Sequence, residues 1–335
     1  MVSFRSLDIE CDLPSLLAFS ARAYENTAYQ ASERYVRWLY EEHPAARGPK
    51  DCLLAVDGKE ILGCIHRMPL PGRYGEQRFT LVSLQNHIVD ERLRGGAGVL
   101  LLRQAVRGEQ AVFSPGVHGR LSEAYRRLGY EQIEGCWLIR PIARIKGALQ
   151  LFRARLGHEI LSILRSDQLA RLSDRLQISI APEATLIERL AAIMNRQAST
   201  GPGLTVEWTP DLVRWRYFSE KGPRHIFVRK GSNTCAVLSF GVRFGLEVVR
   251  LLEYEDDGDA RFMMDVIAVA RATGAAAMFA FALLPEFRDK LLSNGWRRRK
   301  DAPVSFLMGP LAANGLSASA GVSDFGFESL RTEVA

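Results

Sequence analysis

Residues 92–102, RLRGGAGVLLL, place three glycines and an alanine between arginines and a run of leucines. The leucines predict a helix, and the glycines in front of it predict a turn whose main-chain amides meet at the positive end of the helix dipole. Because glycine has no Cβ, a phosphate can approach these amides closely. The segment predicts an anion-binding turn, with a glycine needed only for the shape of a strand–turn–helix junction as the alternative.

The spacing of the glycines excludes two common phosphate loops. The chain contains no GxxxxGK[ST] segment, the pattern of a P-loop. It also has no GxGxxG after a first strand with an acidic residue about 20 positions later, the pattern of a dinucleotide-binding turn. The pattern that occurs is R-x-x-G-x-A, formed by Arg92, Gly95 and Ala97. A second segment, AYRRLGY at 124–130, ends the next predicted helix.

Together these segments resemble the coenzyme A pyrophosphate loop and the following helix end of the GNAT superfamily of acyl-CoA-dependent N-acyltransferases. The resemblance covers 1–142 well and 200–310 loosely. It implies acetyl-CoA as the cofactor, and an amine that attacks the thioester directly. It assigns cofactor binding to the strand before the loop, the loop itself, the first helical turn and one later residue: Asn86, His87, Ile88, Arg92, Leu93, Arg94, Gly95, Gly96, Ala97, Gly98, Val99 and His118.

For catalysis, the resemblance implies Tyr125 as the acid that protonates the leaving thiolate. The alternative is a tyrosine that only packs on an amphipathic helix. His87 is the best-placed base, since histidine titrates in a useful range, and a hydrogen-bonded structural histidine is its alternative. A water chain could also take the proton. Further candidates are His66, His118, Asp90 and Glu91.

The hydrophobic pattern predicts the elements that position these residues. Residues 13–42 predict helices, with Ser32 as an N-cap. Two apolar runs separated by Asp57-Gly58 predict a β-hairpin, and a third strand is predicted from 77 to 89. After the glycine turn and its helix come a strand at 110–115, a helix at 119–130 and one final strand at 131–142. This order predicts an α/β (α+β) fold.

The chain then repeats itself at low identity. YVRWLYEEHP at 35–44 resembles LVRWRYFSEKGP at 212–223, so that Trp38 and Tyr40 match Trp215 and Tyr217 at a constant offset. A duplicated domain explains this repeat. We predict two GNAT-like domains, each a mixed, largely antiparallel sheet flanked by helices. The divisions are 1–142 (acetyltransferase domain), 143–200 (helical linker), 201–311 (degenerate GNAT-like domain) and 312–335 (weakly ordered tail).

The second copy lacks the features assigned to the cofactor in the first copy. Its corresponding loop is EDDGD at 255–259, whose added aspartates would repel a pyrophosphate. Leu291 takes the place of Tyr125. This copy is therefore predicted to shape the acceptor cleft. The matched tryptophans are predicted to pack on the two sheets, with stacking on a sugar substrate as the alternative.

Composition narrows the class of protein. The chain has 335 residues and a net charge of +6, which suits a phosphorylated small molecule as well as a nucleic acid, and we predict no nucleic-acid partner. The five cysteines form no CxxC pair, which predicts free thiols in a reducing cytoplasm and no metal site. We expect neither a membrane span nor a secretory signal. The basic segment 144–175 predicts a connecting helix, with peripheral membrane contact as the alternative.

These observations predict a cytoplasmic N-acetyltransferase that moves an acetyl group from acetyl-CoA to a primary amine of a small metabolite. An amino sugar or nucleotide sugar is the first candidate for the acceptor, by analogy with two-domain members of the superfamily. Two alternatives stay open. One is a membrane-surface acyltransferase that uses longer acyl-CoA, and the other is a non-catalytic CoA-binding interaction protein.

Overall fold

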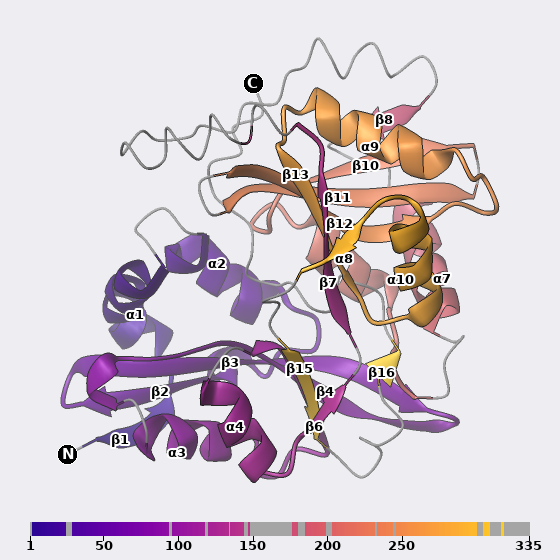
Figure 1. The fold of residues 1–335 in the computed structure, drawn as a ribbon. Coiled ribbons are helices and arrows are strands. Elements are labelled where there is room, and N and C mark those ends of the chain that lie inside the picture. The colour runs from indigo at the N-terminus through magenta and orange to yellow at the C-terminus, as the bar shows by residue number, and fades with distance from the viewer. Residues whose placement is uncertain are drawn as a thin grey trace.

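The computed structural model describes residues 2–24, 29–93, 96–117, 120–133, 135–143, 147, 176–179, 185–198, 203–231, 233–243, 246–299, 304–308 and 316–317. These residues form two mixed sheets, one in each half of the molecule, with helices on both faces of each sheet (Figure 1). The predicted fold class is confirmed. The basic segment predicted as a connecting helix lies outside the described residues, except for Gly147.

Along its main path the first sheet is antiparallel except where β4 runs parallel to β5, and the short strands β9 and β16 beside it also pair in parallel. In spatial order its path contains β1 (Ser3–Ser6), β2 (Cys52–Asp57), β3 (Glu60–Tyr74), β4 (Gln77–Val89), β5 (Ala111–Val117), β15 (Val304–Met308) and β6 (Glu131–Ile133). Two short strands extend it beside β3, namely β9 (Leu204–Val206) and β16 (Leu316–Ser317).

The second sheet has the same plan, and its one parallel pair is β12 with β13. In spatial order it contains β8 (Gln177–Ser179), β10 (His225–Lys230), β11 (Thr234–Arg243), β12 (Leu246–Glu255), β13 (Ala277–Ala282), β7 (Cys136–Pro141) and β14 (Arg297–Arg298). Each position in this sheet corresponds to one in the first sheet, which supports the duplication that the sequence predicts.

Each sheet has, inside its strand path, a strand from the other half of the sequence, and the first sheet also takes β9 and β16 from the second half. β15 lies between β5 and β6, and β7 lies between β13 and β14. The prediction of one continuous strand over 131–142 is wrong, because the chain leaves the first sheet after Ile133 and enters the second at Cys136. Glycine is required at this crossing, since a Cβ on Gly135 would lie 2.9 Å from the Phe281 ring.

The predicted domain boundaries remain a proposal, which the strand order modifies. β8 occupies in the second sheet the edge position that β1 occupies in the first, and this favours a second unit that starts near residue 177. The strands β7 and β15 each belong to one unit by their position in the sequence, but they pair with strands of the other unit. Of the predicted tail, only Leu316–Ser317 is described, and it pairs with β9.

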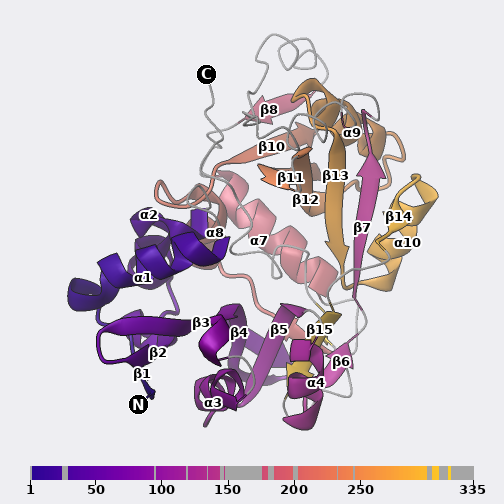
Figure 2. The ribbon, with the colours of Figure 1, turned by 60° about the vertical axis from the view of Figure 1, so that its left-hand side comes forward.

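The helices form three layers separated by the two sheets (Figures 1 and 2). One apolar cluster joins the inner helices to the inner faces of both sheets, and separate clusters hold the outer helices. The inner helices are α1 (Ile9–Tyr24), α2 (Glu33–Arg37), α7 (Thr185–Ala198) and α8 (Pro210–Phe218). The outer ones are α3 (Gly96–Ala105) and α4 (Arg120–Arg127) on the first sheet, and α9 (Phe262–Ala272) and α10 (Pro285–Ser293) on the second.

Short helical turns complete the structure, and several local predictions are confirmed. The turns are η1 (Tyr29–Ala31), the π-helix η2 (Trp38–Glu42), η3 (Gly48–Asp51) and η4 (Glu91–Leu93). The side chain of Ser32 caps α2 by accepting a hydrogen bond from the Tyr35 N–H. Gly58 adopts a φ of 59° in the turn between β2 and β3, a conformation that favours glycine.

The matched tryptophans of the repeat contact each other between the two halves. The indole of Trp38 donates to the Trp215 carbonyl at 3.0 Å, and the indole of Trp215 donates to the Trp38 carbonyl at 2.9 Å. Their rings are stacked with centroids 4.6 Å apart. The prediction that each tryptophan packs on its own sheet is therefore replaced by a reciprocal contact, which joins the two units about a local pseudo-two-fold relation.

Candidate functional site

The first sheet opens between β4 and β5. These strands pair over Leu81–Ser83 and Ala111–Phe113, and beyond this stretch no pairing joins them. On its other side, β5 pairs with β15 over Val112–Val117. Backbone groups of β4 past Ser83 thus face an opening instead of a neighbouring strand. Such an edge can accept an extended ligand that carries amide groups.

A β-bulge lies on β4 at this opening. The register with β3 shifts between Cys64 and His66, so that Asn86 and His87 together face one residue of β3. Asn86 has a φ of 50°, which is uncommon for a residue with a side chain. Its amide donates to the Tyr35 hydroxyl at 2.7 Å, on the inner face of the sheet. The bulge therefore turns two adjacent side chains toward different surroundings.

His87 is buried beside the backbone of Gly98 in the first turn of α3. Both ring nitrogens are shielded from solvent, and the backbone of Gly98 is the polar group that approaches the imidazole. Burial lowers the pKa of His87 to about 4, so the imidazole is neutral at pH 7. The contact with Gly98 links His87 on β4 to the first turn of α3.

Two glycines in α3 have different surroundings. A Cβ on Gly98 would lie 3.3 Å from the Val89 Cγ2, so this glycine lets α3 approach β4 closely. A Cβ on Gly96 would meet nothing within 4 Å, so space is open beside the first turn of the helix. Main-chain N–H groups in this position lack partners within the helix and can bind an anion. Of the predicted loop, Arg94 and Gly95 lie outside the described residues.

The side chains of the remaining loop residues have structural contacts. Arg92 forms ion pairs with Glu60 at 2.6 Å and with Asp90 at 2.9 Å, and these bonds raise its pKa and lower those of both carboxylates. Leu93 is buried in the outer cluster. Two carboxylates therefore hold the Arg92 guanidinium. A phosphate at this turn would contact main-chain N–H groups, or Arg92 would first have to leave these carboxylates.

Tyr125 faces the same opening from α4. Its hydroxyl lies close to the Ser114 side chain, at the point where β5 parts from β4. Its ring stacks on Phe306 of the exchanged strand β15, with centroids 5.4 Å apart. Burial raises the pKa of Tyr125, which keeps the hydroxyl protonated at neutral pH. A protonated hydroxyl at this position can donate to a departing thiolate.

The other predicted acid–base residues are less well placed. His66 lies on β3, where it bonds to the Tyr40 hydroxyl, and burial lowers its pKa to about 4. Asp90 forms an ion pair with Arg92, and Glu91 is exposed in η4. His118 lies outside the described residues. Spacing in the sequence did not reveal the hydrogen bond between Asn86 and Tyr35, because the two residues come from distant elements.

In the second half, the chain's own carboxylates occupy the corresponding region. Lys290 donates to both carboxylate oxygens of Asp256, at 2.8 Å each. Just before α9, Asp259 accepts a hydrogen bond from the Arg261 N–H at 2.9 Å and pairs with Lys230 at 2.7 Å. The Lys230 bond lowers the pKa of Asp259. Leu291, at the position matched to Tyr125, is fully buried on α10.

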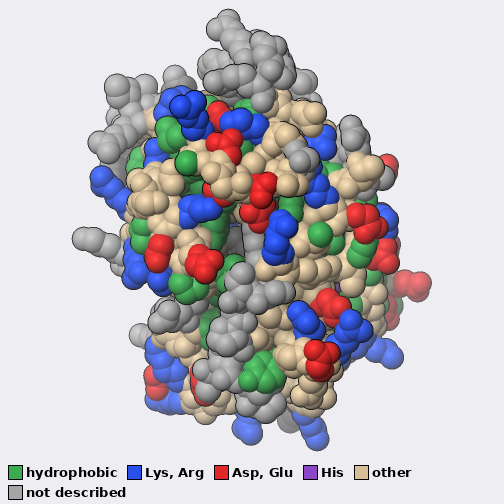
Figure 3. All heavy atoms as spheres, turned by 90° about the vertical axis from the view of Figure 1, so that its right-hand side faces the viewer, with side chains coloured by type: hydrophobic (Ala, Val, Ile, Leu, Met, Phe, Trp, Pro, Cys, Tyr) green, Lys and Arg blue, Asp and Glu red, His purple; other side chains and the backbone are tan. Residues whose placement is uncertain are grey.

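Other binding features are limited. Within the described residues, no three His, Cys, Asp or Glu side chains cluster to hold a metal ion. None of the described helices is long and apolar enough to cross a membrane. On the face shown in Figure 3, Lys and Arg side chains are interspersed with Asp and Glu over both halves, so the described residues form no continuous basic surface there.

Comparison with known proteins shows the fold. No protein-family model matches the chain, and no curated protein sequence matches it either. Saccharomyces cerevisiae N-myristoyltransferase is similar in structure, with a TM-score of 0.64 and 11% identity over 92% of this chain and 82% of that one. A GCN5-related N-acetyltransferase from Kribbella flavida gives a TM-score of 0.56 and 18% identity over 93% and 72%.

A putative acetyltransferase from Pyrococcus horikoshii covers the two chains most evenly of these three, with a TM-score of 0.57 and 11% identity over 97% of this chain and 95% of that one. The likeness extends across both sheets in each case, so it includes the second half as well as the first. The chain thus has the GNAT fold, with the similarity to these three structures extending over both of its sheets.

Proposed function

We propose that the protein transfers an acetyl group from acetyl-CoA to a primary amine of a small metabolite, at the opening between β4 and β5. One observation carries the proposal: His87 of β4 with the first turn of α3 lies on one side of this opening, and the Tyr125 hydroxyl beside Ser114 of β5 lies on the other. The fold supports the proposal, since the neighbours named above are described as N-acetyltransferases and an N-myristoyltransferase.

In this proposal the cofactor lies along β4 and against the start of α3. The backbone at Asn86–Ile88 pairs with the amides of the pantetheine arm. The pyrophosphate is held by main-chain N–H groups at the start of α3, where Gly96 leaves open space. Arg94, Gly95 and His118 keep the roles that the sequence predicts for them.

The reaction forms one bond and breaks one. The amine nitrogen attacks the thioester carbonyl carbon, a C–N bond forms, and the C–S bond breaks. The departing thiolate takes the proton of Tyr125, which a raised pKa keeps in place at neutral pH. As the amide forms, the nitrogen loses its extra proton to solvent, and solvent returns a proton to the tyrosine for the next cycle.

The remaining proton comes from the acceptor's ammonium group. Its pKa of about 10.4 exceeds the value of about 4 for His87, so transfer to that imidazole costs about 9 kcal/mol. Loss of the proton to water at pH 8 costs about 3 kcal/mol. We therefore assign His87 to accept a hydrogen bond from the incoming amine or from a water molecule, while water carries the proton away.

The second half has a different role in this proposal. Asp256 and Asp259 place negative charge where the first half would hold the pyrophosphate, and a second phosphate group there would be repelled. Leu291 offers no proton. The second half therefore binds no cofactor and contributes its inner face, with α7 and α8, to the acceptor side of the first sheet.

The deciding experiment is a thiol-release assay with acetyl-CoA across a panel of amines, with amino sugars and nucleotide amino sugars included. Release above the rate of hydrolysis, together with an acetylated product of the expected mass, supports the proposal. CoA binding without release for any amine would favour the non-catalytic alternative. If calorimetry detects no binding of CoA to the protein, the proposal is wrong.

A longer acyl group is the second candidate, because the N-myristoyltransferase neighbour is described with myristoyl-CoA bound. An acyl-CoA series from two to fourteen carbons with one accepted amine distinguishes the two candidates. Acetyl transfer predicts that kcat/KM falls as the chain lengthens. A rise toward fourteen carbons would replace acetyl-CoA by a long-chain acyl-CoA, and liposome co-sedimentation would then test for membrane contact.

A further inference from the structure

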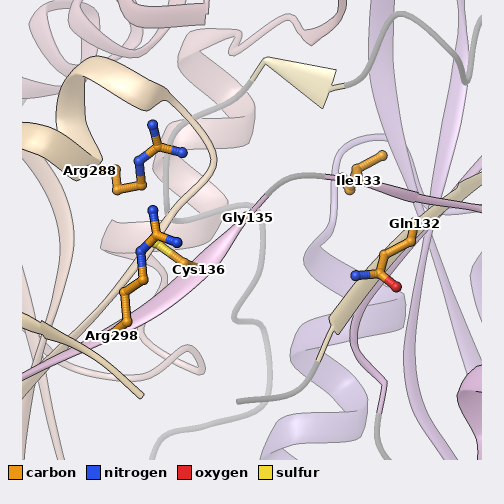
Figure 4. Close-up of a pocket in the computed structure, with 6 residues that line it drawn as sticks. All are labelled: Gln132, Ile133, Gly135, Cys136, Arg288 and Arg298. Carbon is orange, nitrogen blue, oxygen red and sulfur yellow. The ribbon is translucent and has the colours of Figure 1, made fainter. Parts of the chain in front are cut away.

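A pocket of about 300 Å³ lies where the chain crosses from the first sheet to the second (Figure 4). One wall is the end of β6 and the start of β7, and the other comes from α10 and β14 of the second half. The pocket therefore exists because the two halves exchange strands. Its lining residues are Gln132, Ile133, Gly135, Cys136, Arg288 and Arg298.

The lining is positively charged. The guanidinium groups of Arg288 and Arg298 lie near each other beside Cys136 (Figure 4), and none of the six lining residues carries a carboxylate. Arg288 also contacts the exposed carboxylate of its neighbour Asp289 at 3.1 Å. Two adjacent guanidinium groups repel each other unless an anion lies between them, and their planar donors match the oxygens of a phosphate or a carboxylate.

Gln132 adds a further donor. Its side-chain oxygen accepts a hydrogen bond from Arg126 at 2.9 Å, which leaves the amide N–H₂ group as its remaining polar function. Arg126 adjoins Tyr125 on α4. The pocket thus presents N–H donors from three side chains, and it is connected to the proposed catalytic helix through one hydrogen bond.

Along the first sheet, only β15 separates the pocket wall formed by β6 from β5, which borders the β4–β5 opening. Ile133 of β6 pairs with Ser305 of β15, and the next residue of β15, Phe306, pairs with Ser114 where β5 parts from β4. Neighbouring strands are about 4.8 Å apart, so two strand spacings separate the pocket wall from β5 by about 10 Å. Ile133 belongs to the inner apolar cluster. Cys136 packs against the outer cluster of the second sheet and Gln132 bonds to the outer helix α4, so the pocket lies where the inner and outer layers meet at this end of both sheets.

We propose that this pocket binds the oxyanion of the acceptor, a phosphate or a carboxylate several bonds away from the amine. The identification of the ligand as the acceptor rests on the proposed function, whereas the binding of an oxyanion does not. The substrate class is then an amine that also carries an acidic group, bound with the amine at the β4–β5 opening and the acid at Arg288 and Arg298.

The first test measures oxyanion binding without any turnover. Cys136 is half-buried in the pocket and Cys11 is exposed on α1, so alkylation followed by mass spectrometry reports on both in one sample. Inorganic phosphate should slow alkylation of Cys136 about fivefold or more relative to KCl of the same ionic strength, and should leave Cys11 unaffected. Calorimetric titration with phosphate gives a second readout.

Variants identify the residues responsible. Arg288→Gln and Arg298→Gln should each abolish the protection, and Arg298→Lys should restore part of it. Arg297→Gln is the matched control, since Arg297 precedes Arg298 on β14, is exposed, and does not line the pocket. Unchanged protection in Arg288→Gln and Arg298→Gln, or equal alkylation in phosphate and KCl, would overturn the proposal.

The second test uses acceptors. Amines should be compared in sets of three, which differ only by a phosphate, a carboxylate or a neutral hydroxyl group. Arg298→Gln should raise KM for the acidic members about tenfold to a hundredfold and leave the neutral member unchanged. The phosphate and carboxylate arms show which oxyanion is preferred. Equal KM for all three members would overturn the acceptor assignment, whereas absence of turnover with every amine would contradict the proposed function and leave the phosphate result standing.

Discussion

The replacement Tyr125→Phe tests the assignment of the proton donor at the candidate site. It removes one oxygen atom and keeps the ring, which is fully buried and stacks on Phe306 with centroids 5.4 Å apart. The packing should therefore persist. The loss of the hydroxyl contact with Ser114 should lower the free energy of unfolding by about 1 kcal/mol.

The catalytic effect should be much larger than the effect on folding. General acid catalysis contributes about 10²- to 10⁴-fold, so kcat should fall by that factor, which corresponds to about 3–5 kcal/mol of barrier. The affinity for CoA should change less than about twofold, because the hydroxyl acts on the sulfur only as the bond breaks. Thiol release at saturating acetyl-CoA and amine measures kcat, and calorimetry measures CoA binding.

Tyr130→Phe is the matched control for this variant. Tyr130 is buried, its ring lies edge-on to Tyr125 at 4.8 Å, and its hydroxyl has no hydrogen-bond partner among the described residues. The same chemical change is thus made in the same cluster, away from Ser114. Equal values of kcat for Tyr125→Phe and the unaltered protein would refute the assignment, and an equal loss in both variants would show that packing is responsible.

Three further predictions concern the fold and the cofactor. Trp38→Phe and Trp215→Phe should each cost about 1–3 kcal/mol in urea unfolding, because each removes a buried hydrogen bond between the units; strictly additive losses in the double variant would contradict the reciprocal contact. Burial holds the pKa of His66 at about 4, so the unfolded chain binds more protons between about pH 4 and 6.5, and stability falls as the pH drops through this window. His66→Gln should remove up to about 3 kcal/mol of that fall, and an unchanged pH profile of the urea midpoint would disprove this. Gly96→Ala should leave unfolding unchanged or strengthen the fold by up to about 1 kcal/mol, while CoA binding in calorimetry weakens about tenfold; unaltered affinity would exclude this turn as the phosphate site.

Local conformation could be predicted from the sequence. The strand at Gln77–Val89 and the hairpin turn at Gly58 match their predicted positions, since side-chain period and the choice of turn residues act over a few neighbours. The start of α2 at Ser32 was predicted for the same reason. The repeat of the tryptophan segment was also visible, because a duplicated unit retains the order of its elements.

The sequence by itself therefore determined most of the elements and their order along the chain. Only the tertiary structure decided which strands pair, because pairing joins residues far apart in the chain and adjacent residues do not encode it. Residues 131–142 have the composition of one strand, yet they contribute to two sheets, and Phe306 reaches the ring of Tyr125 from the far end of the chain. The arginine pocket at the crossing follows from that exchange, since packing of the two halves brings its walls together.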